Sequence, residues 1–175
     1  MKIQSLSRFM SIACTLSIGI IPLVTVWYWT AFESNLPLIQ AKYSGTLFSM
    51  EYISSWQIVA GAVVSLFGCC LLIMALWQLR SFFNLTSNGE YFSQRTTMHL
   101  SRFANILFLC AIFKPISVML YSVILTWKNP PGSRSLILDF GSQDLLTILM
   151  ACTFLIIMWI FKEGSRISKE NASFI

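Results

Sequence analysis

The fold of this chain is decided by residues Ile58–Leu79, whose sequence is IVAGAVVSLFGCCLLIMALWQL. No charged side chain interrupts this apolar run. A helix that crosses the hydrocarbon core of a bilayer needs about 20 mostly apolar residues, because each residue rises about 1.5 Å across roughly 30 Å. The run is therefore long enough to span a membrane, and it predicts a transmembrane helix.

Three further runs of the same character accompany it, namely Phe9–Ala31, Phe103–Trp127 and Leu145–Phe161. Of the 175 residues, 56% are hydrophobic and only 11% are charged, whereas soluble domains carry about 25% charged residues. Lipid offers no partners to open backbone groups, so helices are the expected spanning elements. The sequence predicts one all-α integral membrane domain over residues 1–175, with four transmembrane helices in an antiparallel bundle.

The first apolar run begins after Lys2 and Arg8, as a secretory signal peptide also would. It is too long for a signal peptide, however, and Trp27, Tyr28 and Trp29 stand where small cleavage-site residues are expected. Aromatic clusters of this kind are typical of the membrane–water interface. We therefore expect the first helix to be retained as an anchor.

The basic residues alternate between the two sides of this membrane plan. Eight fall in the N-terminal segment, the second loop and the C-terminal tail, and three fall in the first and third loops. The eight are Lys2, Arg8, Arg80, Arg95, Arg102, Lys162, Arg166 and Lys169, and the three are Lys42, Lys128 and Arg134. Because basic loops stay in the cytoplasm, both termini are predicted to be cytoplasmic. This topology and the attraction of basic residues to anionic lipid explain the net charge of +5, so direct nucleic-acid binding is not expected.

The second loop predicts a tight hairpin between the second and third helices. Asn88-Gly89 is a strong turn signal, and Ser93 can cap the helix that follows. Both helices are expected to extend a turn or two into the cytoplasm. Four aromatic residues surround the tip of this hairpin: Phe82, Phe83, Tyr91 and Phe92. They either bury against one another and the lipid headgroups or anchor a cytoplasmic partner, since aromatic residues are favoured in both settings.

Lys114 lies near the middle of the third span and is followed directly by Pro115. A lysine at that depth costs about 2.5 to 3.5 kcal/mol on insertion scales. Pro115 has no N–H, so the carbonyl of Ala111 loses its helical donor and the helix is expected to kink. Lys114 is either a structural residue or a binding residue. In the first case its ammonium donates to freed carbonyls or snorkels to the interface, and in the second it binds an anion or a lipid headgroup.

The start of the fourth helix is marked by Asp139, Ser142 and Asp144, whose predicted role is N-terminal capping. None of the four predicted spans contains Asp or Glu. A proton-coupled carrier usually needs a carboxylate at depth, so this absence disfavours that class of transporter.

Gly61, Ser65 and Gly68 follow one another at helical spacing and predict a close helix contact, which we assign to packing within the monomer. The cysteines all lie inside predicted spans, where thiols behave as small apolar residues. They are Cys14, Cys69, Cys70, Cys110 and Cys152. No metal site is expected, because metal sites need several converging ligands.

Two groups of segments resemble the signatures of a known family. LRSFF (79–83), NGEYFS (88–93) and LSRFA (100–104) are similar to its central signature, and FKEGSRISKEN (161–171) is similar to its closing signature. The family is a bacterial membrane family catalogued as domain of unknown function 2975. The resemblance covers the chain from about Ile58 onward and implies four helices in the inner (cytoplasmic) membrane. Because some members are encoded beside small helix-turn-helix regulators, it also implies a membrane partner for such a regulator.

Two functions are compatible with these observations. The first is a non-enzymatic, regulatory protein that docks a cytoplasmic partner through the second loop and the tail. The second is a small transporter, channel or lipid- or anion-binding protein centred on Lys114 and Pro115. The residues assigned to the docking surface, or alternatively to a staple of ion pairs between the helices, are Glu90, Tyr91, Phe92, Arg95, Arg102, Glu163, Arg166, Glu170 and Asn171.

An enzyme is not expected, since His99 is the only histidine and no nucleophile with its base or pair of carboxylates stands out. No cofactor is expected either. The predicted partners are membrane lipid and either a small cytoplasmic helix-turn-helix regulator or further copies of the chain.

Overall fold

The computed structural model describes residues 2–31, 53–91, 93–128, 136 and 140–172. Within these residues the chain forms four long helices, each long and apolar enough to cross a membrane. They are α1 (Lys2–Thr30), α3 (Ser55–Ser87), α4 (Gln94–Thr126) and α5 (Ser142–Ala172). The predicted class, an all-α protein with four membrane-spanning helices, is confirmed.

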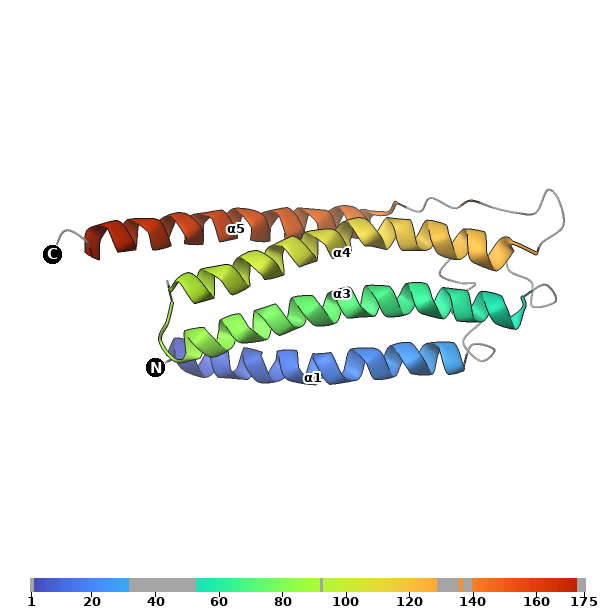
Figure 1. The fold of residues 1–175 in the computed structure, drawn as a ribbon, viewed down its shortest axis with the longest axis horizontal. Coiled ribbons are helices and arrows are strands. Elements are labelled where there is room, and N and C mark those ends of the chain that lie inside the picture. Colours follow the sequence, from blue (N-terminus) through green and yellow to red (C-terminus); the bar gives the residue numbers. More distant parts are fainter. Residues whose placement is uncertain (1, 32–52, 92, 129–135, 137–139, 173–175) are drawn as a thin grey trace.

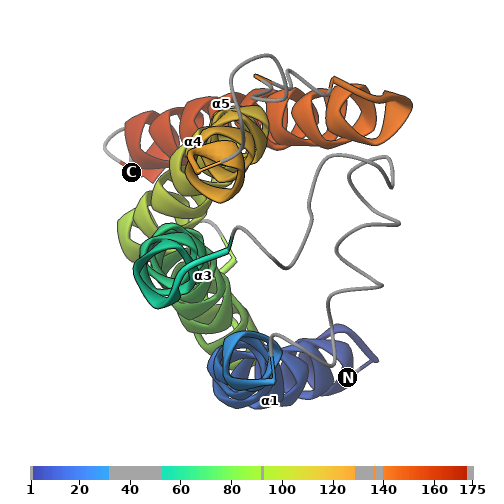
Figure 2. The ribbon, with the colours of Figure 1, turned by 90° about the vertical axis from the view of Figure 1, so that its right-hand side faces the viewer.

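The four helices form an open row rather than a closed ring. The main contacts join α1 to α3, α3 to α4 and α4 to α5. Viewed along the helices, the row is curved, with α1 and α5 at its two ends (Figure 2). Lipid is as apolar as the helix surfaces, so packing and hydrogen bonds between neighbours hold membrane helices together and nothing requires the row to close.

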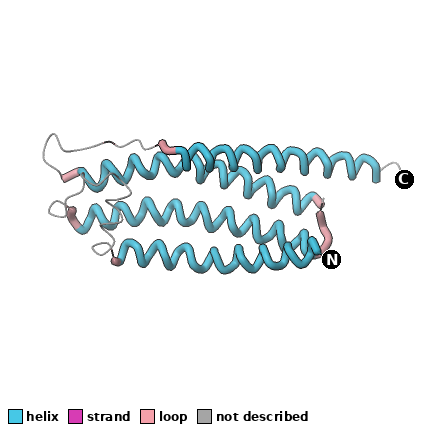
Figure 3. Tube along the Cα trace, turned by 180° about the vertical axis from the view of Figure 1, so that it is seen from behind, coloured by secondary structure: helices cyan, strands magenta, loops and turns pink. Residues whose placement is uncertain are grey.

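Successive helices run in opposite directions (Figures 1 and 3). The contacts of α1 with α3 show this directly, because Ser11 bonds Asn84 near the end of α3 whereas Trp29 bonds Ser65 nearer its start. The start of α1, the α3–α4 connection and the end of α5 therefore lie together, and we call this the hairpin end. The opposite end, where α3 begins and α4 ends, is the far end.

All four helices continue beyond the apolar runs that predicted them. α3 extends past Leu79 to Ser87, and α4 begins at Gln94, about two turns before Phe103. The hairpin does not stand alone, because α1 and α5 reach the same end. Gln4 of α1 is the nearest neighbour of Gly89 in the connection, with Nε2 at 3.9 Å from the position of a Cβ.

The small residues of α3 pack inside the monomer, as predicted. A Cβ on Gly61 would stand 2.3 Å from the ring of Trp29, and Gly68 faces Phe113. Between them, Ser65 accepts a hydrogen bond of 2.7 Å from the indole N–H of Trp29. The hydroxyl of Tyr121 lies 2.7 Å from the same Ser65 oxygen, so one serine joins α1, α3 and α4.

Gln57 joins α3 to α4 at the far end, a role that was not predicted from the sequence. Its side chain is fully buried. The amide Nε2 donates to the carbonyls of Ile124 and Leu125 at 2.7 and 3.3 Å, while Oε1 accepts from the N–H of Ser54 at 2.8 Å. Carbonyls in the last turn of a helix have no intrahelical donor, so Gln57 supplies the hydrogen-bond donor that these two carbonyls lack within α4.

Toward the hairpin end, α3, α4 and α5 share an apolar cluster. Its buried members are Ala75, Leu100, Phe103, Ala104 and Met158. Phe82 and Phe161 pack against this cluster, with their ring centres 6.4 Å apart. Of the aromatic residues near the predicted tip, Phe82 therefore belongs to the core.

Candidate functional site

The α3–α4 connection is a turn that, with the first turn of α4, forms an exposed surface. Gly89 has φ of +90°, a left-handed conformation that glycine adopts without strain. Glu90, Tyr91 and Arg95 are all exposed, and we call these three residues the hairpin tip. Phe92 lies outside the described residues.

A buried threonine holds the turn in place. Thr96 is fully buried, and its hydroxyl donates a hydrogen bond of 2.7 Å to the backbone carbonyl of Glu90. Its backbone N–H donates to the hydroxyl of Ser93 at 3.2 Å, which is the capping predicted for this serine. The backbone that carries the exposed Glu90 is therefore bonded to the first turn of α4.

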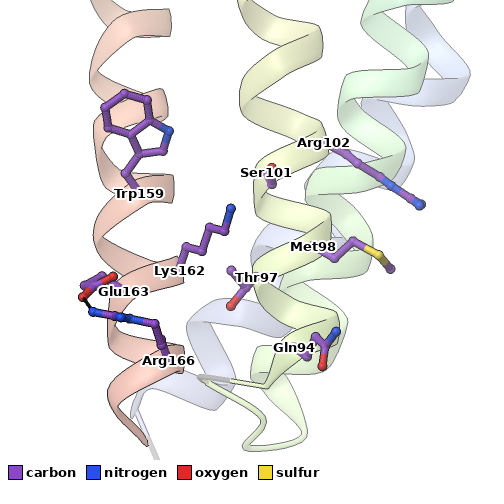
Figure 4. A pocket seen from close by; sticks show the side chains of 9 residues that line it. All are labelled: Gln94, Thr97, Met98, Ser101, Arg102, Trp159, Lys162, Glu163 and Arg166. Carbon is purple, nitrogen blue, oxygen red and sulfur yellow. Dashed lines mark hydrogen bonds and ion pairs between the residues drawn. The ribbon is translucent and has the colours of Figure 1, made fainter. Parts of the chain in front are cut away.

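A cleft of about 940 Å³ opens between α4 and α5 at the hairpin end (Figure 4). We call it the α4–α5 cleft. Its lining residues are Gln94, Thr97, Met98, Ser101, Arg102, Trp159, Lys162, Glu163 and Arg166. Three of the predicted site residues, Arg102, Glu163 and Arg166, thus line one cleft, whereas the hairpin tip does not contribute to it.

The side chains that line the cleft point in different directions (Figure 4). Lys162 points from α5 toward α4, whereas Arg102 extends from α4 away from α5. Glu163 forms an ion pair with Arg166 one turn later on the same helix. This pair lies within α5, so it does not link α5 to the hairpin as the predicted staple requires. Glu170 and Asn171 belong to the last turns of α5, but their side chains lie outside the described residues.

The second polar site is an ion pair between α4 and α5. The ammonium of Lys114 lies 2.5 Å from Oδ1 of Asp144, whose other oxygen accepts a 3.0 Å hydrogen bond from the N–H of Gly141. The side chain of Asp144 is 10% exposed and that of Lys114 is 44% exposed. Asp144 has the capping contact that was predicted, and it also provides the carboxylate partner that the sequence did not assign to Lys114.

No acidic partner was predicted for Lys114, because the four predicted spans contain neither Asp nor Glu. The predicted fourth span starts at Leu145, but α5 starts at Ser142 and includes Asp144 in its first turn. The sequence does contain a signal for this pair. Asp144 stands one residue before the predicted fourth span, and Lys114 lies inside the third. With Asp144 beside it, Lys114 is not an isolated positive charge.

The same ion pair shows how α5 is placed along α4. Thr126, the last residue of α4, follows Lys114 by twelve positions, which corresponds to about 18 Å of helix. α5 therefore begins beside the middle of α4 and extends past it at the hairpin end (Figure 1). Pro115 lies inside α4, and the carbonyl of Lys114 accepts a 2.7 Å hydrogen bond from the hydroxyl of Ser117.

Four apolar helices joined by buried polar contacts define a small multi-pass membrane protein. The model of the family described as "Protein of unknown function (DUF2975)" matches residues 40–175, and the chain belongs to this family. The resemblance noted in the sequence is thereby confirmed, and α1 precedes the matched residues. No curated protein and no solved structure matches the chain.

Proposed function

We propose that this chain is a non-enzymatic protein of a bacterial inner membrane that docks a small cytoplasmic protein at the hairpin tip. The observation that carries this proposal is the exposed trio Glu90, Tyr91 and Arg95, which stands on a turn bonded to a buried threonine. The helix-turn-helix regulator implied by the family resemblance is the partner that we propose. α5 ends at the same end of the molecule (Figure 1), and its last turns are the second contact that we propose for this partner.

The chemistry of the hairpin tip suits protein recognition. Tyrosine and arginine are enriched among the residues that contribute most to binding at protein interfaces. A surface that is already ordered loses less conformational entropy on binding than a flexible loop does. Glu90 and Arg95 give the hairpin tip both signs of charge, which favours a partner with complementary charges rather than a nucleic acid.

The distribution of basic residues supports a cytoplasmic hairpin end. In the described helices, Arg8, Arg80 and Arg95 lie toward this end, together with the basic residues of the α4–α5 cleft. Because positive residues are retained on the cytoplasmic side, we propose that both termini are cytoplasmic. A fluorescent protein fused to the C-terminus should fold and fluoresce, whereas a fused periplasmic phosphatase should be inactive. The opposite result would place the hairpin tip outside the cytoplasm and end the docking proposal.

Site-specific photocrosslinking in intact cells tests the docking itself. A photoreactive residue at Tyr91 should capture a stoichiometric soluble protein, whereas the same residue at Trp127, which is exposed near the far end, should not. Arg95→Glu should reduce that capture at least about fivefold, the effect of losing roughly 1 kcal/mol. Equal capture from both positions, or none at Tyr91, would contradict the proposal.

A second candidate function, binding or transport of an anion or lipid, rests on the Lys114–Asp144 pair. Lys114 is 44% exposed beside the start of α5, so its ion pair is accessible from one side. Asp144 already neutralises the lysine, and an anion would have to displace the carboxylate. Lys114→Leu should abolish an activity of this kind and leave crosslinking at Tyr91 unchanged. Loss of crosslinking instead would favour a structural role for the pair.

A further inference from the structure

The α4–α5 cleft lies where the apolar surface of α5 ends. The predicted apolar run of this helix ends at Phe161, and Lys162 is the next residue. One turn earlier, Trp159 lines the cleft and is 69% exposed, and Met98 of α4 is 43% exposed. On α5 the cleft therefore has an exposed indole, that of Trp159, on the side of the membrane span, followed by charged residues toward the hairpin end (Figure 4). On α4, Met98 lies nearer the hairpin end than Arg102.

Among the residues that the structure describes, the charges of the cleft do not balance. Its lining includes three cationic side chains and one carboxylate, and that carboxylate, Glu163, is paired with Arg166. In the part of the chain that the structure describes, neither Lys162 nor Arg102 lies within 4.0 Å of an acidic oxygen. Lys162 points toward the α4 wall, where Thr97 and Ser101 also line the cleft (Figure 4). The surplus positive charge predicts an anionic ligand.

We propose that the α4–α5 cleft binds the phosphate of an anionic membrane phospholipid. Lys162 is the primary contact for the phosphate, and Arg102 on α4, whose side chain extends away from α5, adds to the positive potential from a greater distance. Basic pockets between membrane helices on the cytoplasmic side have the charge and position to hold such headgroups. Trp159 lies where the glycerol and upper acyl chains would run, and tryptophan is favoured at that level of the bilayer.

The exposed indole of Trp159 favours a lipid over free phosphate, because inorganic phosphate has no apolar part that could contact it. The cleft shares no residue with the hairpin tip, so the lipid proposal goes beyond the docking proposal and does not depend on it. Loss of lipid binding would leave crosslinking at Tyr91 as it is.

Native mass spectrometry of the purified full chain in mild detergent tests the proposal. Phosphatidylglycerol should bind at one saturable site and phosphatidylcholine should not. Lys162→Gln should weaken this binding about fivefold, which corresponds to about 1 kcal/mol for one cation near the surface. Lys128→Gln, a matched change of an exposed lysine at the far end, should have no effect. Lys162→Arg should preserve binding and show that the charge is responsible.

Thermal unfolding supplies a second readout. Phosphatidylglycerol should raise the unfolding midpoint of the natural chain and raise that of Lys162→Gln less. Equal effects of phosphatidylglycerol and phosphatidylcholine would overturn the proposal, as would equal losses in Lys162→Gln and Lys128→Gln. Stabilisation by millimolar inorganic phosphate equal to that by phosphatidylglycerol would overturn the assignment to lipid.

Discussion

At the scale of single residues, Lys114 and Asp144 show how a membrane protein accommodates a charge. A lone lysine inside the bilayer is costly, but a carboxylate 2.5 Å away compensates part of that cost. The N–H of Gly141 satisfies the second carboxylate oxygen. The pair therefore positions the start of α5 against α4, because either partner left alone would be a charge in an apolar setting.

We expect the two charges to be strongly coupled. Lys114→Leu and Asp144→Asn should each lower the free energy of unfolding by about 2 kcal/mol, since each leaves one charged group without its partner. Asparagine retains an acceptor for the N–H of Gly141. Because the double variant leaves neither charge alone, it should lower the free energy of unfolding by about 1 to 3 kcal/mol less than the sum of the two single variants. Unfolding of the four proteins in one detergent measures this difference, and additive losses would show that the pair does not contribute.

At the scale of elements, each helix contact combines close packing with a polar contact. Trp29 fills the space over Gly61 and bonds Ser65, which joins α1 to α3. His99 Nδ1 lies 2.7 Å from Gln78 Oε1 and joins α3 to α4 in the half near the hairpin end. Hydrogen bonds between membrane helices contribute about 0.6 kcal/mol each on average. The polar contacts therefore define register more than they supply stability.

Gly61 should tolerate no side chain. Gly61→Ala places a Cβ 2.3 Å from the Trp29 ring, and the displaced indole should lose its bond to Ser65, at a cost of about 1 to 3 kcal/mol. Gly19→Ala on α1 is the control, because nothing lies within 4 Å of its Cβ and alanine favours helix by about 1 kcal/mol. Thermal unfolding should show a lower midpoint for the first variant and an unchanged or higher midpoint for the second. A neutral Gly61→Ala would contradict this packing.

At the scale of the whole molecule, the row is open and its last helix is displaced along the others. α5 starts beside Lys114 rather than beside the end of α4, and it extends furthest at the hairpin end (Figure 1). The curved row leaves most apolar side chains of α1 and α5 exposed, as lipid-facing side chains are expected to be. The hairpin tip and the α4–α5 cleft lie at the same end of the molecule.

The displacement predicts a measurable depth. Spin labels attached through cysteines at Leu145, Ile116 and Trp127 report on three exposed positions, in a chain without its natural cysteines. In bilayers, the label at Leu145 should lie as deep as the label at Ile116 and much deeper than the label at Trp127, since α5 begins about 18 Å from the end of α4. Accessibility to oxygen and to a soluble nickel complex measures these depths. A label at Leu145 as shallow as that at Trp127 would contradict the placement of α5.

The sequence by itself determined the four helices, because apolar runs of membrane length act locally and lipid leaves the backbone no alternative. It also indicated the turn at Asn88-Gly89, the cap at Ser93 and the family. Only the tertiary structure decided which polar groups meet. Neighbouring helices are shifted relative to each other along their axes, and no local sequence pattern encodes this offset. It decides that Lys114 pairs with Asp144 and that Gln57 caps α4. That offset arises from side-chain packing between neighbours, so it also decided that Lys162 and Arg102 line one cleft.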